Sequence, residues 1–475
     1  MMQLYNTLSR TVEPFKALDS KNVRLYACGL TVYSQPHIGN WVAYIYWDLL
    51  VRTLTASDFA VTHVQNITDV GHLTSDEDAG EDKMLKGALR EGLTAWEVAE
   101  KYIQIADHEA YELLGLRRPT HMPRATEYIE QQAEFVRALD EKGFTYTITD
   151  GIYFDTSKLK NYGELARLDI DGLRFGARVA DTGKKNPTDF AVWKFSDPSE
   201  KRDMEWDNPL PGTPGKGFPG WHLECSVMAG ELLGEQIDIH TGGIDHIPVH
   251  HTNEIAQTES LTKKRFSQFW VHGNHLKVNG TKISKSLGNG FTLQDITDRG
   301  YDLEAFKLLV LSKHYRTEGN FTWEILDAAQ NRLNELRAWA DLRHQPSTDT
   351  MPTELDELFR NTKSNILAAL QNDLNTPLAL AELGKLVSYM SNIPIPGVEG
   401  EHTEGMLAFI DSIFGLNLDG RPDITQQQKD LLTARQKARD TKDWAESDSL
   451  RDELKEQGIA IRDTDYGQQW SRIKD

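Results

Sequence analysis

The most informative residues of the chain are its two cysteines, Cys28 and Cys225. Cys28 ends a short apolar run, and Cys225 follows Trp221 in a Pro-Gly-Trp-His-Leu-Glu-Cys segment. Farther along, His250 and Glu254 are four positions apart, so on a helix their side chains would share one face. Two thiols, an imidazole and a carboxylate form a ligand set that suits zinc. The alternative interpretation is that both cysteines are small buried apolar residues.

A second chemical segment runs from Pro36 to Asn40 and reads Pro-His-Ile-Gly-Asn. Triphosphate binding needs side-chain donors, a close backbone approach that only glycine permits, and a helix N-terminus directed at the anion. His37, Gly39 and Asn40 offer these features.

A third segment, Lys282 to Ser286, reads Lys-Ile-Ser-Lys-Ser. Lys282 and Lys285 on a glycine-flanked loop suit a mobile clamp that neutralises charge developing on phosphates. An isolated Lys-x-x-Lys pair is also typical of a solvated basic turn, so this segment alone leaves both interpretations open.

The composition is that of a globular protein, with 475 residues, 39% hydrophobic and 26% charged. This length predicts about three domains. Because the chain has neither a long apolar run nor the pattern of a secretory signal, we expect a cytoplasmic protein with no membrane association. Two cysteines exclude a disulfide framework. The net charge of -20 disfavours a nucleic-acid partner on average, although a local basic face on an acidic enzyme can bind RNA.

The elements that must position these residues alternate between strands and helices. Residues 22–34 predict a buried strand leading into a turn, residues 41–54 a helix, and residues 61–67 a second strand. Strand, turn and helix with glycine at the junction is typical of a nucleotide-binding α/β unit. Residues 238–245 predict a later strand that ends in a glycine-rich turn.

The expected secondary structure then changes twice along the sequence. Short β-like runs between about 143 and 220 indicate an inserted module, in which the Pro- and Gly-rich residues 209–220 predict a loop rather than a helix or central strand. Residues 71–82 predict a surface loop. From about Leu303 onward, helical patterns dominate and indicate a second large domain.

The His-Ile-Gly-Asn segment and the Lys-Ile-Ser-Lys-Ser segment, about 245 residues apart, together resemble the paired signatures of the class I aminoacyl-tRNA synthetases. The signatures of that class are His-Ile-Gly-His and Lys-Met-Ser-Lys-Ser. Within the class, the segments around the cysteines are similar to the cysteinyl-tRNA synthetase family. The landmarks that match that family, in its order, are Cys28-Gly-Leu-Thr-Val-Tyr, Asn66-Ile-Thr-Asp, Arg174-Phe-Gly-Ala-Arg-Val, Asp189-Phe-Ala-Val-Trp-Lys, Pro219-Gly-Trp-His-Leu-Glu-Cys-Ser, Asp238-Ile-His, His250-His-Thr-Asn-Glu-Ile-Ala-Gln, His314-Tyr-Arg, Asp373-Leu-Asn-Thr-Pro and Asp463-Thr-Asp-Tyr-Gly-Gln-Gln-Trp.

The resemblance implies an α/β fold with a Rossmann-like parallel-sheet catalytic domain, an inserted connective module and a mostly α-helical anticodon-binding domain. The divisions that we expect are 1–120 for the first half of the catalytic domain, 121–218 for the connective module, 219–302 for the second half with the Lys-Ile-Ser-Lys-Ser loop, 303–325 for a stem-contact linker, 326–425 for the helical anticodon-binding domain and 426–475 for a small C-terminal α/β appendage.

The activity implied is cysteine–tRNA ligation, in which ATP and L-cysteine give cysteinyl-adenylate and the cysteinyl group passes to the 3′ end of tRNA(Cys). We expect Mg²⁺ to accompany the ATP and the chain to act as a monomer. The resemblance also implies one Zn²⁺ per chain. Its ligands would be Cys28, Cys225, His250 and Glu254, whereas His251 points about 100° away on a helix and is the weaker candidate. Zinc would bind a substrate thiol in a way that serine or alanine cannot match.

The resemblance further assigns roles to single residues. The catalytic residues would be His37, Asn40, Lys282 and Lys285. The ATP-binding residues would be these four together with Gly39 and Ser284. The amino-acid pocket would hold Gly29, Thr68, Trp221 and Asp245, with Asp245 as the partner of the substrate ammonium. Candidates for reading the anticodon by stacking or charge are Arg332, Arg337, Trp339 and Trp470.

Several positions depart from the family pattern. Asn40 replaces the second signature His, Thr241 replaces a glycine, Thr252 replaces a Glu, and Ile283 replaces a Met. Residues 70–83 are longer and more acidic than the family's short turn, which fits a solvated loop, a lid or a second metal site, with the solvated loop favoured.

Two rival functions remain open. The first is that of related enzymes that join cysteine to an amino-sugar, which lack the long C-terminal part present here. The second is that of a catalytically silent, zinc-bearing binding protein. His37, Lys282 and Lys285 argue against the second rival, and Asn40 leaves it open.

Overall fold

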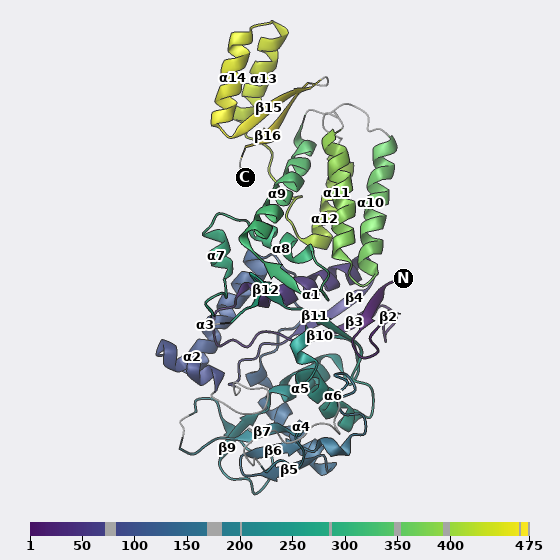
Figure 1. Cartoon of the computed structure of the whole chain (residues 1–475), viewed down its shortest axis with the longest axis vertical. Helices are drawn as coiled ribbons and strands as arrows, with labels where there is room; N and C mark the ends of the chain where they lie inside the picture. Colours follow the sequence, from purple (N-terminus) through teal and green to yellow (C-terminus); the bar gives the residue numbers. More distant parts are fainter. Residues whose placement is uncertain are drawn as a thin grey trace. The chain divides into compact units, whose positions relative to one another are not determined.

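The computed structural model describes residues 1–71, 82–168, 183–199, 202–284, 287–345, 353–392, 400–464 and 467–473. The chain forms two compact units (Figure 1). The first contains Met1–Leu293 and Tyr315–Gly319, and the second contains Gln294–His314 and Asn320–Asp475. Three features of the sequence lie outside the described residues, namely the landmark at Arg174, the pair Lys285 and Ser286, and positions 72–81 of the acidic segment.

A four-stranded parallel sheet forms the centre of the first unit. Its strands, in spatial order, are β11 (Ser267–Gly273), β10 (Ile237–Gly243), β3 (Asn22–Ala27) and β4 (Ala60–Gln65). Apolar side chains of these strands, such as Leu25 and Ile239, have no exposed surface, because a parallel sheet is covered on both faces. The predicted Rossmann-like sheet is confirmed.

Three helices next to this sheet carry predicted site residues. They are α1 (Ile38–Ala56), which connects β3 to β4, α5 (Trp221–Leu233), which precedes β10, and α6 (His250–Thr262), which connects β10 to β11. Helix α1 begins before the predicted start at Trp41, because its first turn is closed by polar groups. The Asn40 side-chain oxygen accepts a hydrogen bond from the His37 backbone N–H at 3.0 Å.

The inserted module contains a five-stranded antiparallel sheet and the helix α4 (Ile129–Glu141). The strands, in spatial order, are β5 (Thr145–Ile148), β6 (Gly151–Phe154), β7 (Phe190–Phe195), β9 (Lys216–Pro219) and β8 (Trp206–Asp207).

The prediction that residues 209–220 form only a loop is wrong at their end, where β9 pairs with both β7 and β8. Pro219 is tolerated because it is the last residue of the strand. The next N–H, that of Gly220, donates to the Val192 carbonyl at 3.0 Å.

The first unit also holds shorter elements around the sheet. They are the hairpin β1 (Gln3–Asn6) and β2 (Thr11–Pro14), the helices α2 (Lys83–Glu91) and α3 (Ala95–Asp107), a π-helical segment (His108–Leu113), and the hairpin β12 (Leu276–Val278) and β13 (Thr281–Lys282). This last hairpin leads into the Lys-Ile-Ser-Lys-Ser segment.

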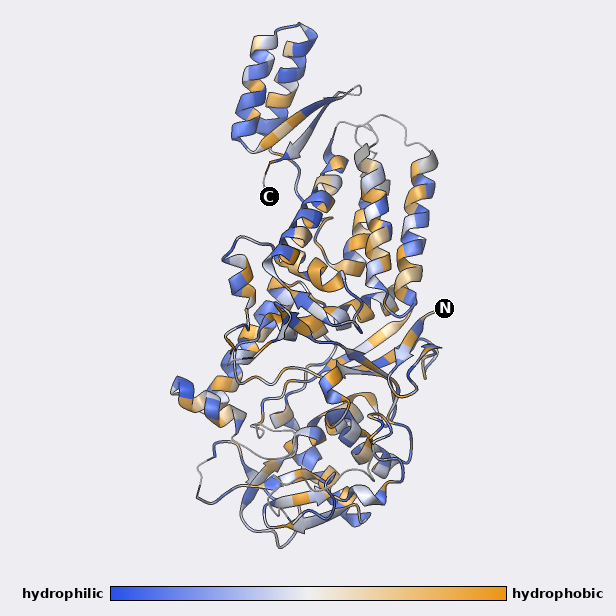
Figure 2. Cartoon of the chain, viewed as in Figure 1, coloured by the Kyte–Doolittle hydropathy of each residue, from blue (hydrophilic) through white to orange (hydrophobic). Residues whose placement is uncertain are grey.

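Helices dominate the rest of the chain, as predicted. The elements are α7 (Leu293–Thr297), α8 (Leu303–Leu311), β14 (Gly319–Phe321), α9 (Trp323–Ala340), α10 (Thr353–Gln371), α11 (Thr376–Asn392), α12 (Gly400–Phe414), α13 (Gln426–Asp440), α14 (Trp444–Glu456), β15 (Ile459–Thr464) and β16 (Gly467–Arg472). Figure 2 shows α13 and α14 as mostly hydrophilic, and they pack with β15 and β16 on a small apolar cluster that includes Leu454 and Trp470. No described helix is long and apolar enough to cross a membrane.

Candidate active site and metal centre

A cavity of about 350 Å³ opens where the parallel strands end. Gly29, Thr68 and Asp245, which line it, follow β3, β4 and β10 respectively. The carboxyl ends of parallel strands meet at one edge of a sheet, where ligands of such folds bind. The cavity therefore gathers residues that are more than 200 positions apart in the chain.

Gly29 is a position where the fold admits only glycine. A Cβ atom there would lie 1.6 Å from the backbone oxygen of Asn66, which is far inside van der Waals contact. The Gly29 N–H donates to the Asn66 side chain at 2.9 Å, and that side chain donates in turn to the Thr68 hydroxyl at 3.0 Å. These bonds hold the turns after β3 and β4 together.

The four predicted metal ligands converge on one side of this cavity. Cys28, Cys225, His250 and Glu254 each offer a ligand atom, and all four atoms lie within 4.8 Å of one another. Helix α6 places His250 and Glu254 on the same face, with His250 Nε2 and Glu254 Oε1 3.0 Å apart. Oε1 is buried and accepts no hydrogen bond of good geometry from the described residues, and its 3.0 Å contact is with His250, itself a candidate ligand. A buried carboxylate oxygen left in this state beside two thiols fits a metal ligand.

A second set of four residues shares two of these ligands. Cys28, His240, His251 and Glu254 also have ligand atoms within 4.8 Å of one another. His240 Nε2 donates to Glu254 Oε2 at 2.7 Å, whereas its Nδ1 is buried with no hydrogen-bond partner among the described residues, so it is free to bind a metal. If the metal binds the set with His250, His240 is the residue that orients Glu254.

Further buried histidines surround the ligands. The sequence analysis named His251 only as a weaker ligand candidate, and it did not single out His222 or His272. His251 lies 3.3 Å from Cys28 Sγ through Nε2, and its Nδ1 lies 2.7 Å from His272 Nε2. His272 reaches the Thr7 hydroxyl at 2.7 Å. His222 Nδ1 is 3.0 Å from His250 Nδ1. The histidine content of the sequence was visible, but these pairings depend on the order of the strands.

The ligand cluster has strongly shifted pKa values. Burial raises the pKa of Glu254, and the neighbouring His240 and His250 lower it further than burial raises it, to about 2. Burial lowers the pKa of His250, but the negative charges of Glu254 and Cys225 raise it overall to about 10. A hydrogen bond from Cys28 lowers the pKa of Cys225, whereas burial raises that of Cys28. Without a metal, Glu254 is thus ionised and His250 protonated, so a metal that binds through His250 would displace its proton.

The nucleotide-binding signatures meet although they are far apart in the sequence. A Cβ atom on Gly39 would lie 2.8 Å from the Ile283 side chain, and the Ile38 N–H donates to the Phe291 carbonyl at 2.7 Å. His37 and Asn40 line the cavity. Because Asn40 Oδ1 accepts the His37 N–H, its side-chain N–H₂ group is left as a donor toward an anion.

The lysine segment lies beside this turn. Lys282 ends β13 and is exposed, and the Ser284 N–H donates to the Asn289 side chain at 2.9 Å. The Asn289 side chain donates back to the Lys282 carbonyl at 3.2 Å and so closes the loop. Lys285 lies outside the described residues, so its predicted role remains a prediction.

Comparisons with known proteins point to one family. The family model of the tRNA synthetases class I (C) catalytic domain matches residues 14–331, and that of the cysteinyl-tRNA ligase anticodon binding domain matches residues 421–470. Cysteine–tRNA ligase 1 of Burkholderia lata is 44% identical over 98% of this chain and 96% of its own length. The cysteine–tRNA ligase of Treponema denticola is 37% identical over 99% of this chain and 100% of its own length. The chain belongs to the cysteine–tRNA ligase family.

As a member of this family, the ligase is a class I aminoacyl-tRNA synthetase. Its fold is similar to that of the methionyl-tRNA synthetase of Mycobacterium tuberculosis solved with methionyl-adenylate, with a TM-score of 0.61 and 13% identity. This likeness covers 84% of the ligase and 93% of that chain. At such low identity it shows the shared fold alone.

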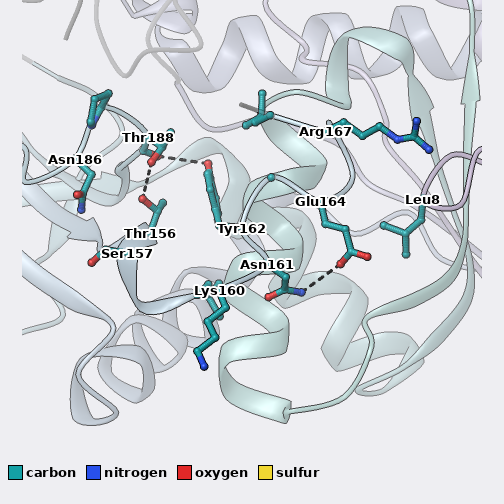
Figure 3. A pocket seen from close by; sticks show the side chains of 14 residues that line it. Leu8, Thr156, Ser157, Lys160, Asn161, Tyr162, Glu164, Arg167, Asn186 and Thr188 are labelled. Atoms are coloured by element: carbon teal, nitrogen blue, oxygen red, sulfur yellow. Dashed lines mark hydrogen bonds between the residues drawn. The ribbon is translucent and has the colours of Figure 1, made fainter. Parts of the chain in front are cut away.

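A larger cavity of about 880 Å³ lies in the inserted module of the ligase (Figure 3). Its lining is mainly polar, and the Thr156 and Thr188 hydroxyls bond to each other at 2.6 Å. None of the predicted site residues lines it. Leu168, which also lines it, directly precedes positions 169–182, which lie outside the described residues. Of these two cavities, only the smaller one is lined by predicted site residues.

The structure adds pocket residues that the sequence analysis did not predict, His246 among them, and removes two RNA-binding candidates. His246 lines the cavity beside Asp245, with its ring 5.0 Å from that of His250. Its position next to Asp245 was the only signal in the sequence. Trp339 and Trp470 are 1% and 4% exposed, so the prediction that they stack on RNA bases is wrong, because both rings are packed inside the protein.

Proposed function

We propose that the ligase activates L-cysteine with ATP to cysteinyl-adenylate and pyrophosphate, and then transfers the cysteinyl group to the 3′ end of tRNA(Cys), using the 350 Å³ cavity. One observation carries this proposal. The predicted metal ligands Cys28, Cys225 and His250 line the same cavity as His37 and Asn40 of the nucleotide-binding turn. A thiol amino acid and a triphosphate can therefore meet there.

The donor set of the metal centre is that of a zinc site. Two sulfur atoms, one imidazole nitrogen and one carboxylate oxygen are ligands that Zn²⁺ prefers. When bound, zinc would lower the pKa of a substrate thiol and form a metal–sulfur bond with it. His240 occupies the second oxygen of Glu254, so Oε1 stays directed at the other ligands. An ordinary pocket would separate cysteine from serine by only about 1–3 kcal/mol, so this centre is what makes the pocket selective.

The remaining residues of the pocket orient the amino acid. The Asp245 carboxylate is suited to bind the substrate ammonium. The ring of Trp221, with its centroid 4.7 Å from that of His250, forms a wall beside the metal ligands. Gly29 allows close approach to the backbone, and the Thr68 hydroxyl is held by Asn66. Together they present the carboxylate of the substrate toward His37.

The residues at the nucleotide-binding end of the cavity, which we call the phosphate end, position ATP and stabilise developing charge. His37, Gly39 and the Asn40 amide would contact the nucleotide, and Lys282, Ser284 and Lys285 would stabilise the charge that develops on the α-phosphate and the leaving pyrophosphate. Mg²⁺ would accompany the ATP. No side chain has to act as a nucleophile, because the substrate carboxylate attacks the α-phosphorus directly.

The C-terminal half would bind the tRNA. We propose that the helical residues 326–425 and the appendage 426–475 contact the anticodon stem and loop, with residues 303–325 as the stem-contact linker. The match of residues 421–470 to an anticodon binding domain supports this assignment. The monomeric state and the cytoplasmic location stay predictions.

Two assays test the proposal. In ATP–pyrophosphate exchange, we expect activity with cysteine and at least about 100-fold less with serine. Equal exchange with serine would contradict the role of the metal centre. In the second assay, labelled cysteine is offered to total tRNA and to an amino-sugar acceptor. Labelling of the amino-sugar alone would favour the rival function, and an absence of exchange with every amino acid would favour a silent binding protein.

A further inference from the structure

A π-helical segment places a buried carboxylate beside the nucleotide-binding turn. Helix α3 continues directly into the π-helix His108–Leu113. Such segments are rare and recur at functional sites, because the extra residue redirects the side chains that follow. Glu109, the second residue of the segment, is only 5% exposed. A carboxylate at this depth requires polar partners.

The partners of Glu109 stand on both sides of the turn that carries His37 and Asn40. Trp41, which directly follows Asn40, donates its indole N–H to Glu109 Oε2 at 2.9 Å. The side-chain amide of Gln35, two positions before His37, lies close enough to this carboxylate to lower its pKa, against the rise that burial causes. One side chain thus ties together the two ends of the nucleotide-binding turn.

These two contacts reach the cavity itself. Gln35 lines it, and Trp41 is completely buried in the first turn of α1. The Trp41 ring packs edge-on against Tyr44, with centroids 5.2 Å apart, and the Tyr44 hydroxyl accepts the Leu30 N–H at 3.0 Å. The contacts of Glu109 therefore extend to the loop after β3 that also lines the cavity.

We propose that Glu109 is a positioning residue for ATP, which holds Gln35 and Trp41 and thereby fixes the turn from Pro36 to Asn40 in the geometry that receives the phosphates. This proposal rests on the function proposed above and extends it. Both partners are donors, since an indole nitrogen can only donate and the Gln35 amide presents its N–H₂ group. A carboxylate accepts from both, whereas an amide at position 109 would present a donor to one of them.

The substitution Glu109→Gln tests this argument because it keeps the size of the side chain and creates one donor–donor contact. We expect the KM for ATP in pyrophosphate exchange to rise about tenfold, the value for a lost hydrogen bond to a buried charged group. The KM for cysteine and the zinc content stay within twofold of the original values. Trp41→Phe, which removes the indole N–H together with one ring of the buried side chain, raises the KM for ATP in the same direction, and the double variant shows less than the sum of the two effects.

Glu112→Gln is the matched control. Glu112 lies on the same π-helical segment, but its side chain is 67% exposed and pairs only with His108 among the described residues. We expect no change in either KM for this variant.

Two results would overturn the proposal. One is a Glu109→Gln protein that melts earlier but keeps both KM values, because Glu109 would then only brace α3 against α1. The other is an equal rise of both KM values. Calorimetric titration of ATP without cysteine separates this question from the proposed function, because it needs no exchange activity. If Glu109→Gln does not fold, the same titration of Trp41→Phe decides, and unchanged ATP affinity there contradicts the proposal.

Discussion

The two ends of the cavity are built in opposite ways. At the metal end, Cys225, His250 and Glu254 are at most 2% exposed, and each stands on a regular helix. At the phosphate end, Asn40 lies in a helix-entry turn that is only half-buried, and Lys282 is exposed at the end of a two-residue strand. The fixed end suits the recognition of a small thiol, whereas the exposed end must admit a charged nucleotide and release its product.

This difference predicts that substitutions at the two ends reduce activity to different extents. A removed ligand leaves buried charge uncompensated and is expected to disable the metal end completely. A removed donor at the phosphate end leaves a gap that water can fill, so the loss is expected to be partial. The following substitutions test this contrast.

The largest effect is expected from Cys225→Ala. Loss of one sulfur ligand would reduce the bound zinc to well below one ion per chain, and kcat/KM for cysteine would fall at least about 1000-fold, or about 4 kcal/mol. Metal analysis by mass spectrometry and pyrophosphate exchange measure both quantities. Met228→Leu, in the same helix and fully buried, conserves side-chain volume and serves as the control that keeps its zinc. A Cys225→Ala protein that retains one tightly bound zinc ion would contradict the expected complete loss of function at the metal end.

A partial loss is expected from Lys282→Ala. Removal of one charge-stabilising donor typically lowers kcat by about 10²–10³-fold, while the zinc content and the KM for cysteine stay unchanged. The control is Lys277→Ala, because Lys277 is the register partner of Lys282 on β12 and pairs with Glu318 at 2.9 Å. If Lys282→Ala also lost zinc, the two ends would not be independent.

A smaller effect is expected when the layer behind the ligands is changed. His240→Phe keeps a ring next to Trp270, on which His240 stacks at 4.6 Å, but removes the hydrogen bond to Glu254. Loss of such a bond behind a metal ligand weakens metal binding by about 10–100-fold. Competition with a chelator measures the zinc affinity. His240→Gln keeps a hydrogen-bond donor, so its zinc affinity should lie between those of the original protein and of His240→Phe. Unchanged affinity in His240→Phe would show that Glu254 does not need this support.

The smallest effect is expected for the pH dependence of stability, through His63 in strand β4. Burial lowers the pKa of His63 to about 4, opposed by Asp48. Since the folded pKa is below the unfolded value of 6.5, the neutral form stabilises the fold at high pH, and this stability is lost as the pH falls from 6.5 toward 4. Between pH 7.5 and 5.5 the loss is about 1 kcal/mol. Chemical unfolding at both pH values should show this decrease, and His63→Gln should reduce it. An identical pH dependence in the variant would assign the effect to other groups.

The sequence alone predicted the parts of the site that depend on local chemistry. Cysteine is rare enough in this chain for its position to matter, and the spacing of His250 and Glu254 places both on one helix face whatever surrounds them. The turn at His37 and the later lysines have residue types that bind phosphate, and their joint resemblance to the paired class I signatures identified them. The α/β unit followed from the strand, turn and helix patterns near the start of the chain, and the parallel sheet from the resemblance to the family.

Only the tertiary structure decided the contacts that depend on the order of the strands. Because β3 lies between β10 and β4, the turn that carries Cys28 and Gly29 meets both Asn66 and the histidines behind Glu254. The strand β9, the bond from His240 to Glu254 and the bond from Trp41 to Glu109 join segments whose separation in the chain gives no local signal. A sequence records which side chains are present and how they repeat along a helix or strand. Which distant side chains touch depends on sheet order and register, and these are set by the packing of the whole unit.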